Sequence, residues 1–511
     1  MATGGPTVLT DLTVRVVGTV TPPSTAEPSH SWRRIEKALY LDSSHQRGWL
    51  YVAVAKWKQL ADSDLVITDI RIGERPGDVD AGPEWESRPA GIWLQRNPIE
   101  DDVCRAVTDI DVLFGSDAVD PRPRWTLTQS PLRLDADPTV PSARLTFLRG
   151  KAIGRPVGPD VLRFDGNGRF KILQISDTHM VTGVGVCDDA IDPDGNDLPD
   201  CDADPLTVQF MKQVLYLERP DLVVLAGDQL HHDILDSQSA LFKAVAPMIE
   251  RSIPFAAVFG NHDSEGSRAL SRTAQMSILQ SLPHSLCKPG PEHVDGVGNF
   301  HIEIFEPEPS EKSLATLYFL DSHGQIPSKV HNPDYAAIQK SQIDWFTSNS
   351  QRIRNTRGSD KGSSGHDLSL VFQHIPLPEF GDPNLIIRSG HRREPTEGPR
   401  VNSHFYDALL SEGVSTLACA HDHLNDFCAL LPQQPAEDHG KARLRGPWLC
   451  YGGGSGFQGY CSYGSNRYHR RMRVWELDSR TQSLRTWMRV EYAAERTEEL
   501  LLVRHGEIVQ E

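Results

Sequence analysis

The sequence predicts an α/β domain over residues 165–490, with a smaller all-β domain over residues 1–150 before it and a C-terminal tail over residues 491–511. Two observations predict this organisation. The first 150 residues contain short β-type runs and little helical periodicity. From residue 170 onward, apolar runs of strand length alternate with helical periodicity, and five of these runs end in polar residues.

The first 150 residues contain a short internal sequence repeat. Trp49-Leu50 precedes an apolar run at residues 66–70, and Trp93-Leu94 precedes a similar run at residues 107–110. The repeat mildly resembles β-prism adaptor domains, but we expect a β-sandwich in preference. Because no cluster of metal ligands or activated nucleophile occurs in this region, its expected role is support or targeting of the second domain.

The α/β domain carries side chains that can bind metal at the ends of five strand-like runs, at residues 170–175, 222–226, 255–259, 370–372 and 414–420. Ligands in open α/β sheets bind at the carboxyl ends of strands, so we expect these side chains to meet. A mixed set of carboxylates, an amide and imidazoles, without thiolate, suits Mn, Fe or Zn. In chain order the residues are Asp177 and His179; Asp228; Asn261, His262 and Asp263; His374; and His421 and His423.

Other stretches of this domain predict its remaining elements. Apolar residues between Leu206 and Leu217 have helical spacing and predict a crossover helix, and residues 472–477 and 484–490 predict a hairpin ending the second sheet. A Gly/Ser-rich loop is expected at residues 353–367. Residues 454–459 satisfy G-x-G-x-x-G, but no helix is expected to follow, so we interpret these glycines as a loop beside the metals and exclude a dinucleotide site.

The composition limits the partners and the compartment. The formal net charge of −17 argues against a nucleic-acid-binding face. Neither a signal peptide at residues 1–30 nor an apolar run long enough for a membrane span is found, so a cytoplasmic location is expected. The eight cysteines form no dense framework and are expected to be reduced, with a Cys187–Cys201 bridge as the less favoured alternative.

The ordered motifs DTH, GD, GNHD, H and AHDH make the chain similar to the calcineurin-like metallophosphoesterase superfamily. One position departs from the superfamily pattern, because Ala420 stands where that pattern has Gly before the last His pair. The stretches GDQLHHD, FGNHDSEG and YGGGSGFQGY resemble fungal protein phosphatases of the dosage-dependent cell-cycle-regulator type and plant purple-acid-phosphatase-like proteins. The resemblance implies a four-layer α/β/β/α sandwich with mixed sheets.

The same resemblance implies a role for each residue at the strand ends. Asp228 would bridge two metal ions, and a hydroxide held between them would attack phosphorus. His262 would face the leaving group, with Asp263 orienting its imidazole. The implied ligand sets are Asp177, His179, Asp228 and His423 for one metal, and Asp228, Asn261, His374 and His421 for the other.

The predicted function is a binuclear metal-dependent phosphatase acting on phosphomonoesters, with a phosphoprotein as the expected substrate. The alternatives are a phosphodiesterase acting on nucleotides or lipids, and a binding module without catalysis. Candidate substrate residues are His231, which occupies the position of the iron-binding Tyr of purple acid phosphatases, and Arg388 and Arg392 in a basic loop at residues 381–403. That loop is equally well explained as solvated. The native metals, the substrate and the oligomeric state are not determined by the sequence.

Overall fold

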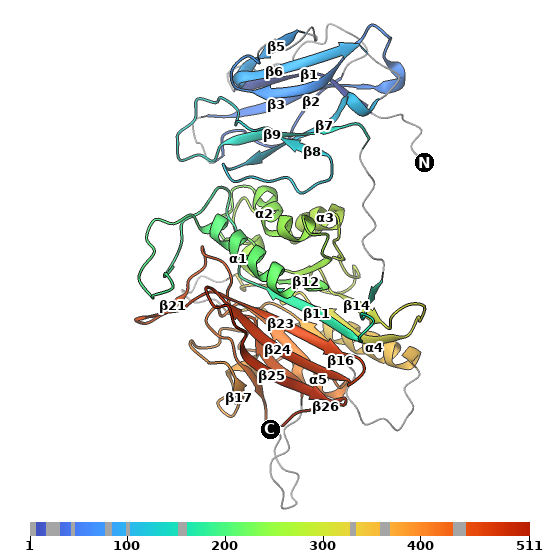
Figure 1. The fold of residues 1–511 in the computed structure, drawn as a ribbon, viewed down its shortest axis with the longest axis vertical. Helices are drawn as coiled ribbons and strands as arrows, with labels where there is room; N and C mark the ends of the chain where they lie inside the picture. The colour runs from blue at the N-terminus through green and yellow to red at the C-terminus, as the bar shows by residue number, and fades with distance from the viewer. Residues whose placement is uncertain are drawn as a thin grey trace, which may run out of the picture. The chain divides into compact units, whose positions relative to one another are not determined.

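The computed structural model describes residues 7–16, 31–41, 46–76, 84–98, 103–151, 161–327, 334–357, 368–432 and 446–510. The chain divides into two compact units, one made of Met1–Pro156, Thr182–Val184 and Gln238–Ala246, the other of the rest (Figure 1). The expected domain boundary near residues 150–165 falls largely on residues 152–160, which lie outside the described residues.

The N-terminal unit contains three antiparallel sheets of three strands each, in the orders β1-β3-β2, β4-β6-β5 and β7-β9-β8. Three sheets agree with the prism alternative, and the β-sandwich that we preferred is wrong. The strands are β1 Thr7–Val16, β2 Ser31–Arg34, β3 Gly48–Lys56, β4 Leu65–Ile72, β5 Trp85–Arg88, β6 Ile92–Pro98, β7 Val107–Phe114, β8 Trp125–Leu127 and β9 Ala143–Arg149. Short 3-10 turns are η1 Trp57–Gln59, η2 Pro89–Gly91 and η3 Val103–Arg105.

The internal repeat of this unit is threefold, whereas the sequence indicated two copies. The first strand of each sheet has a register shift at a Thr-Asp pair, and Asp11, Asp69 and Asp109 each accept the next backbone N–H at 2.8–2.9 Å. Each of these carboxylates also pairs with an arginine from a different sheet: Arg88 with Asp11, Arg149 with Asp69, and Arg33 with Asp109. The three sheets are therefore linked in a cycle.

The second unit contains an eight-stranded and a seven-stranded sheet, both mixed, in the orders β10-β14-β15-β16-β18-β20-β19-β17 and β13-β12-β11-β23-β24-β25-β26. The first half of its strands is β10 Leu162–Arg163, β11 Arg169–Ile175, β12 Leu222–Ala226, β13 Phe255–Val258, β14 Phe300–Phe305, β15 Ser313–Phe319, β16 Leu368–Phe372, β17 Ile386–Ser389 and β18 Thr416–Cys419. The second half is β19 Cys428–Leu430, β20 Trp448–Tyr451, β21 Ser462–Tyr463, β22 Asn466–Arg467, β23 Arg471–Asp478, β24 Ser483–Val490, β25 Thr497–Arg504 and β26 Glu507–Ile508.

The helices within the described residues are α1 Ala203–Glu218, α2 Ser237–Ile249, α3 Arg272–Ser281, α4 Lys340–Arg357 and α5 Phe405–Ser411, with 3-10 turns η4 His262–Ser264 and η5 Pro378–Gly381. The predicted crossover helix is confirmed as α1. Residues 353–357, expected in a loop, end helix α4 instead, and residues 358–367 lie outside the described residues.

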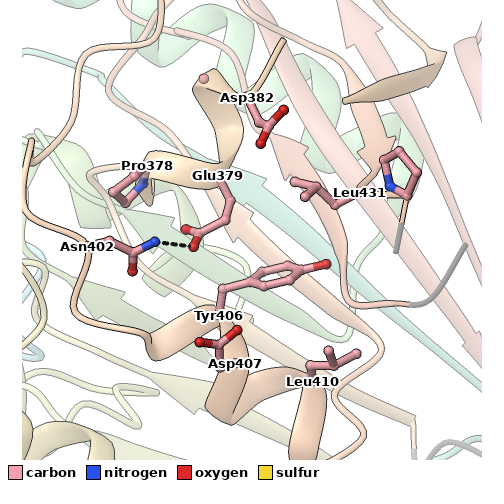
Figure 2. Close-up of a pocket in the computed structure, with 10 residues that line it drawn as sticks. Pro378, Glu379, Asp382, Asn402, Tyr406, Asp407, Leu410 and Leu431 are labelled. Carbon is pink, nitrogen blue, oxygen red and sulfur yellow. Dashed lines mark hydrogen bonds between the residues drawn. The ribbon is translucent and has the colours of Figure 1, made fainter. Parts of the chain in front are cut away.

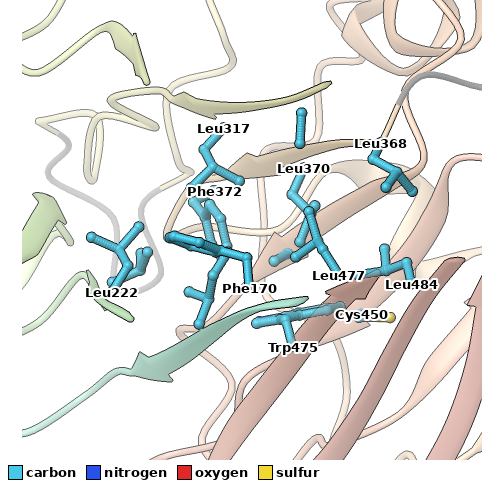
Figure 3. Packing of buried hydrophobic residues seen from close by; sticks show 14 of the residues in the cluster. Phe170, Leu222, Leu317, Leu368, Leu370, Phe372, Cys450, Trp475, Leu477 and Leu484 are labelled. Carbon is cyan, nitrogen blue, oxygen red and sulfur yellow. The ribbon is translucent and has the colours of Figure 1, made fainter. Parts of the chain in front are cut away.

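The two large sheets share one apolar core, so the second unit is built in four layers. Phe170 and Trp475 from the seven-stranded sheet face Leu317 and Phe372 from the eight-stranded sheet (Figure 3). The other face of the eight-stranded sheet packs under α4 and α5, where Phe346 belongs to a second apolar cluster. Helix α1 lies beside β11 and β12 (Figure 1). The predicted α/β/β/α sandwich with mixed sheets, preceded by all-β sheets, is thereby confirmed.

Two expectations about this unit need correction. Residues 491–511 are not simply a tail, because β25 pairs with β24 and β26 pairs with β25, which extends the seven-stranded sheet. The cysteines are not all reduced, since Cys187 is bonded to Cys201 and Cys428 to Cys450. Cys428 and Cys450 are register partners on β19 and β20. Disulfides of this kind are typical of oxidising compartments, so the cytoplasmic location remains a prediction.

A buried carboxylate joins helix α1 to the seven-stranded sheet. Glu218, 2% exposed, accepts hydrogen bonds from Trp487 Nε1 at 2.9 Å, Arg489 Nε at 2.6 Å and Lys171 Nζ at 3.0 Å. Burial opposes ionisation, but these three donors outweigh it and lower the pKa of Glu218. The carboxylate is therefore ionised at neutral pH and offsets the charges of two basic side chains.

We expect Glu218→Gln to lower the free energy of unfolding by about 3 to 5 kcal/mol, because it leaves partly buried cations without their anion. Urea denaturation at pH 7 measures this, with Glu250→Gln as control, since the exposed Glu250–Lys212 pair contributes at most about 1 kcal/mol. The stabilisation from ionised Glu218 is present above the unfolded-state pKa, near 4.5, and is lost as the pH falls through the lower folded-state pKa. Equal losses in both variants would contradict the role of Glu218.

Candidate metal centre

The predicted metal-binding residues follow the carboxyl ends of strands from both large sheets. β11, β12 and β13 are parallel neighbours in one sheet, and β16 and β18 are parallel neighbours in the other. Four of the residues that follow these strands have a left-handed backbone: Asp177 (φ 52°), His179 (φ 47°), Asp228 (φ 49°) and His421 (φ 76°). Such conformations are costly for residues other than glycine and concentrate at functional sites.

The side chains form two groups with metal-ligand spacing among the described residues. One group is Asp177, His179 and His423; the other is Asp228, His374 and His421. Within each group the ligand atoms lie within 4.8 Å of one another. Asp228 Oδ2 lies 3.2 Å from His374 Nε2 in its own group and 4.0 Å from His179 Nε2 in the other, so this carboxylate stands between the two.

Several buried polar atoms at this centre lack a hydrogen-bond partner within the described chain. They are both carboxylate oxygens of Asp177, Oδ1 of Asn261 and Nε2 of His374. Buried polar groups are normally hydrogen-bonded, because leaving one unsatisfied costs about 1 to 3 kcal/mol. Oxygen and imidazole nitrogen atoms gathered in this way suit borderline cations, so the residues present fit a pair of metal ions.

The electrostatics of the centre also favour bound cations. Burial raises the pKa of Asp177 to about 8, and the charge of Asp228 adds to this effect. Burial lowers the pKa of His423 to about 4 and holds those of His179 and His421 well below the usual range. These three imidazoles are therefore neutral at pH 7, which is the form that coordinates metal.

Backbone carbonyls fix the orientation of two of these imidazoles. His374 Nδ1 lies 2.9 Å from Ala226 O, and His423 Nδ1 lies 2.9 Å from Tyr460 O. In a neutral ring whose Nδ1–H donates to a carbonyl, Nε2 carries no proton and can bind metal. Burial lowers the pKa of His374, but the charge of Asp228 outweighs it and raises that pKa to about 9, so this imidazole must lose its Nε2 proton when it binds metal. Tyr460 also stacks on the His423 ring, with 4.0 Å between ring centroids.

His262 lies at the edge of the centre, and a residue that the sequence did not indicate orients it. Its Nδ1 is 2.6 Å from Glu265 Oε2, and its Nε2 is 3.9 Å from Asp228 Oδ2. Asp263, expected to orient this imidazole, instead accepts backbone N–H groups of Asp228, Gly260 and Leu230 at 2.7–3.0 Å. That expectation is therefore wrong: the buried Asp263 shapes the loops that carry Asp228 and Asn261.

Glycines make the close packing around the ligands possible. A Cβ at Gly227 would lie 2.3 Å from the His374 ring, and one at Gly260 would lie 2.0 Å from Asp228 Oδ1. A Cβ at Gly459 would lie 2.7 Å from the His423 ring. The glycines at residues 454–459 therefore belong to a loop beside the centre, as we expected, and two short strands follow them in place of a helix.

The three candidate substrate residues lie in different places. His231 Nδ1 is 3.4 Å from His179 Nδ1. The rings of His231 and His232 lie against each other at a tilt of 46°, with 4.1 Å between their centroids. Arg388 donates to Gln510 O at 2.7 Å, and Arg392 donates to Phe380 O at 2.8 Å. Of the three, only His231 contacts the centre in the described chain. The basic loop contacts Asp422 by a hydrogen bond from the backbone N–H of Glu397.

Residues 170–425, which contain every strand end of the centre, match the family of calcineurin-like phosphoesterases. The chain belongs to this family. The chain is 38% identical over 402 residues to phosphatase DCR2 of Saccharomyces cerevisiae, covering 75% of this chain and 64% of the yeast protein. It therefore spans less than two thirds of that relative. It is 34% identical over 351 residues to probable inactive purple acid phosphatase 29 of Arabidopsis thaliana, covering 65% of this chain and 84% of the plant protein. A dimetal phosphatase structure from Danio rerio is 14% identical, with a TM-score of 0.41, covering 66% of this chain and 99% of that one.

In this calcineurin-like phosphoesterase the alanine before the last His pair causes no conflict. Among the described residues the left-handed conformation falls on His421 and not on Ala420, whose N–H donates to His374 O at 2.9 Å. The backbone conformation at residue 420 is therefore one that alanine can adopt, although the superfamily pattern has glycine there.

Sequence reasoning missed three residues at this centre. Glu265 has a detectable signal, because it lies three residues after His262 and a 3-10 turn brings such positions together. Tyr460 stands in the quoted stretch YGGGSGFQGY, yet nothing in that stretch indicates stacking on His423. Tyr335, whose ring meets the His421 ring edge-on with 4.9 Å between centroids, follows residues outside the described ranges and had no signal.

Proposed function

We propose that the protein is a two-metal phosphatase that hydrolyses phosphomonoesters, with phosphoproteins as the substrate class. The observation that carries this proposal is the pair of facing ligand groups, with Asp228 between them and His262 at their edge. Asp177, His179, Asp228 and His423 would hold one ion, and Asp228, Asn261, His374 and His421 the other. Bound there, two such ions (Fe, Mn or Zn) would lower the pKa of water and neutralise charge on phosphate.

The residues of the chain have separate tasks in this proposal. Asp228 would contribute its carboxylate to both ion positions, and the carbonyl partners of His374 and His423 keep Nε2 directed inward. His262 is partly exposed, and Glu265 holds its Nδ1 proton, so Nε2 can stabilise or protonate a departing oxygen. The phosphoprotein assignment is supported by the fungal resemblance, and some plant relatives carry the word inactive in their names.

Paired assays with metal analysis test the proposal against its alternatives. Full-length protein loaded with Mn, Fe or Zn would be assayed on 4-nitrophenyl phosphate, bis(4-nitrophenyl) phosphate and a phosphopeptide. Preference for the two monoesters supports the proposal, and preference for the diester supports a phosphodiesterase. Two bound metals without turnover of any substrate would instead support a binding module.

None of the described helices combines the length and apolarity that a bilayer crossing requires.

The iron-loaded protein should lack the intense visible band that a tyrosinate ligand gives. His231, and not a tyrosine, lies beside His179. The two tyrosines nearest the centre, Tyr460 and Tyr335, are not placed to act as tyrosinate ligands. Tyr460 OH donates to Glu394 Oε2 at 3.0 Å, and burial raises the pKa of Tyr335 to about 12. A visible spectrum after reconstitution with iron measures this. A strong band that disappears in Tyr460→Phe would contradict it.

Residues 1–153, which carry the three small sheets, should not be required for the chemistry. We expect a chain beginning at residue 154 to keep both metals and most of its kcat on a small aryl phosphate. The shortened chain should unfold at a lower temperature, because two interactions with the removed residues are lost. Lys243 loses its 2.7 Å salt bridge with Asp117, and Ser239 Oγ no longer accepts a hydrogen bond from the backbone N–H of Phe114. Metal content, kcat and thermal unfolding are compared with those of the full chain. A folded, metal-loaded fragment without turnover would overturn the division of labour.

A further inference from the structure

A cavity of about 510 Å³ lies on the helical side of the eight-stranded sheet, lined by residues of η5, α5 and the segments next to them (Figure 2). None of its lining residues belongs to the proposed metal centre. The side chains that decide its chemistry are three carboxylates, a phenol and two leucines: Glu379, Asp382, Asp407, Tyr406, Leu410 and Leu431.

Two of the residues that line this cavity each have a buried oxygen atom without a hydrogen-bond partner among the residues that the structure describes. One is the hydroxyl of Tyr406, whose side chain is buried with a residue exposure of 6%. The other is Oε2 of Glu379, while Oε1 of the same carboxylate accepts a hydrogen bond from Asn402 at 2.7 Å. Figure 2 shows the two side chains on neighbouring walls of the cavity. Each of these two oxygens can accept a hydrogen bond from an N–H group.

The charge around these oxygens is negative. Burial raises the pKa of Glu379, the neighbouring charge of Asp407 raises it further, and His404 opposes both. His404 is itself exposed and already lies 2.9 Å from Asp407. Asp382 accepts the N–H groups of Asn384. Such a lining excludes phosphate and other anions, and it favours a ligand that brings both positive charge and hydrogen-bond donors.

We propose that this cavity binds an alkylguanidinium or alkylammonium group, carried by an arginine or lysine side chain of a polypeptide or by a free polyamine. The several N–H donors of such a cation suit the carboxylate of Glu379 and the hydroxyl of Tyr406, each of which has an oxygen without a hydrogen-bond partner in the described chain. Its methylene stem can lie along Leu410 and Leu431, as the stems of long cationic side chains do on apolar surface. A bare metal ion fits less well, because the cavity supplies neither of the two groups of three closely spaced ligand atoms found in the described chain.

Calorimetric titration of the full-length protein with two isosteric probes tests the proposal. Butylguanidinium should bind, and uncharged butylurea should bind at least about tenfold more weakly, because only the cation pairs with a carboxylate. Glu379→Gln should weaken butylguanidinium binding by about tenfold or more, and Tyr406→Phe by a smaller factor. Asp344→Asn is the matched control, because it removes an exposed charge on α4 outside the cavity.

Turnover of an aryl phosphate should be unchanged in all three variants, which also reports that they are folded. A blocked tripeptide with a central arginine and free spermidine are then compared. Whichever binds more tightly than butylguanidinium, with the same loss in Glu379→Gln, identifies the source of the cation. Equal binding of butylguanidinium and butylurea overturns the proposal, and so does binding that Glu379→Gln leaves unchanged. Calcium binding that depends on Glu379, without binding of butylguanidinium, overturns it as well.

Discussion

Replacing Asp228 with asparagine should remove both metal ions together and abolish most turnover. Asp228 Oδ2 lies 3.2 Å from His374 Nε2 and 4.0 Å from His179 Nε2, so one carboxylate serves both groups. Loss of an outer partner of a metal ligand costs about 10- to 100-fold in affinity. We therefore expect loss of the shared ligand itself to cost more than about 100-fold at both positions.

Metal content after dialysis and kcat on an aryl phosphate measure this effect. His421→Ala provides the contrast, because His421 belongs to one group only and its loss should release one ion while the other stays. Burial lowers the pKa of His421 well below the usual range, so removing its neutral imidazole leaves the charge of the centre nearly unchanged. Selective loss of a single ion from Asp228→Asn would mean that this carboxylate does not bridge.

The strand ends could be predicted because two signals coincide there. Apolar runs such as residues 222–226 are buried on both faces, and parallel neighbours deliver Asp228 and Asn261 to one edge of the sheet. The hairpin of β23 and β24 was also predicted, but β25 and β26, the last two strands, gave no such signal. β25, with the sequence TEELLLVR, pairs with β24 across register shifts, so its apolar residues do not alternate regularly.

The outer contacts of the site could not be predicted, because sequence does not give the direction of a long side chain. Arg388 and Arg392 were candidate substrate residues, yet both guanidinium groups donate to backbone carbonyls of Gln510 and Phe380. The role of Asp263 was misassigned and Glu265 was missed for a related reason. They lie one and three residues after His262, and only the turn at η4 decides which carboxylate reaches the ring.

His262→Ala should keep both metals and lower kcat on an aryl phosphate by about 10²- to 10⁴-fold, the usual effect of losing a positioned acid or base. Its Nε2 lies 3.9 Å from Asp228 Oδ2, close to the metal groups but outside both of them. Metal analysis and steady-state kinetics on the same sample separate a catalytic role from a ligand role. Loss of metal would show that His262 is a ligand, and an unchanged kcat would show that it is dispensable.

Glu265→Gln then tests how His262 is held. The 2.6 Å contact between His262 Nδ1 and Glu265 Oε2 orients the ring and favours its charged form, so an isosteric amide should lower kcat by about 10- to 100-fold. Glu265 Oε1 also lies 3.3 Å from Asn261 Nδ2, so metal content must be measured beside kcat. Asp233→Asn is the control, because it removes an exposed carboxylate beside His232, and kcat should hardly change. If His262→Ala and the double variant His262→Ala/Glu265→Gln have the same kcat, Glu265 acts through His262. A further loss in the double variant would mean that Glu265 acts through Asn261 and the metal instead.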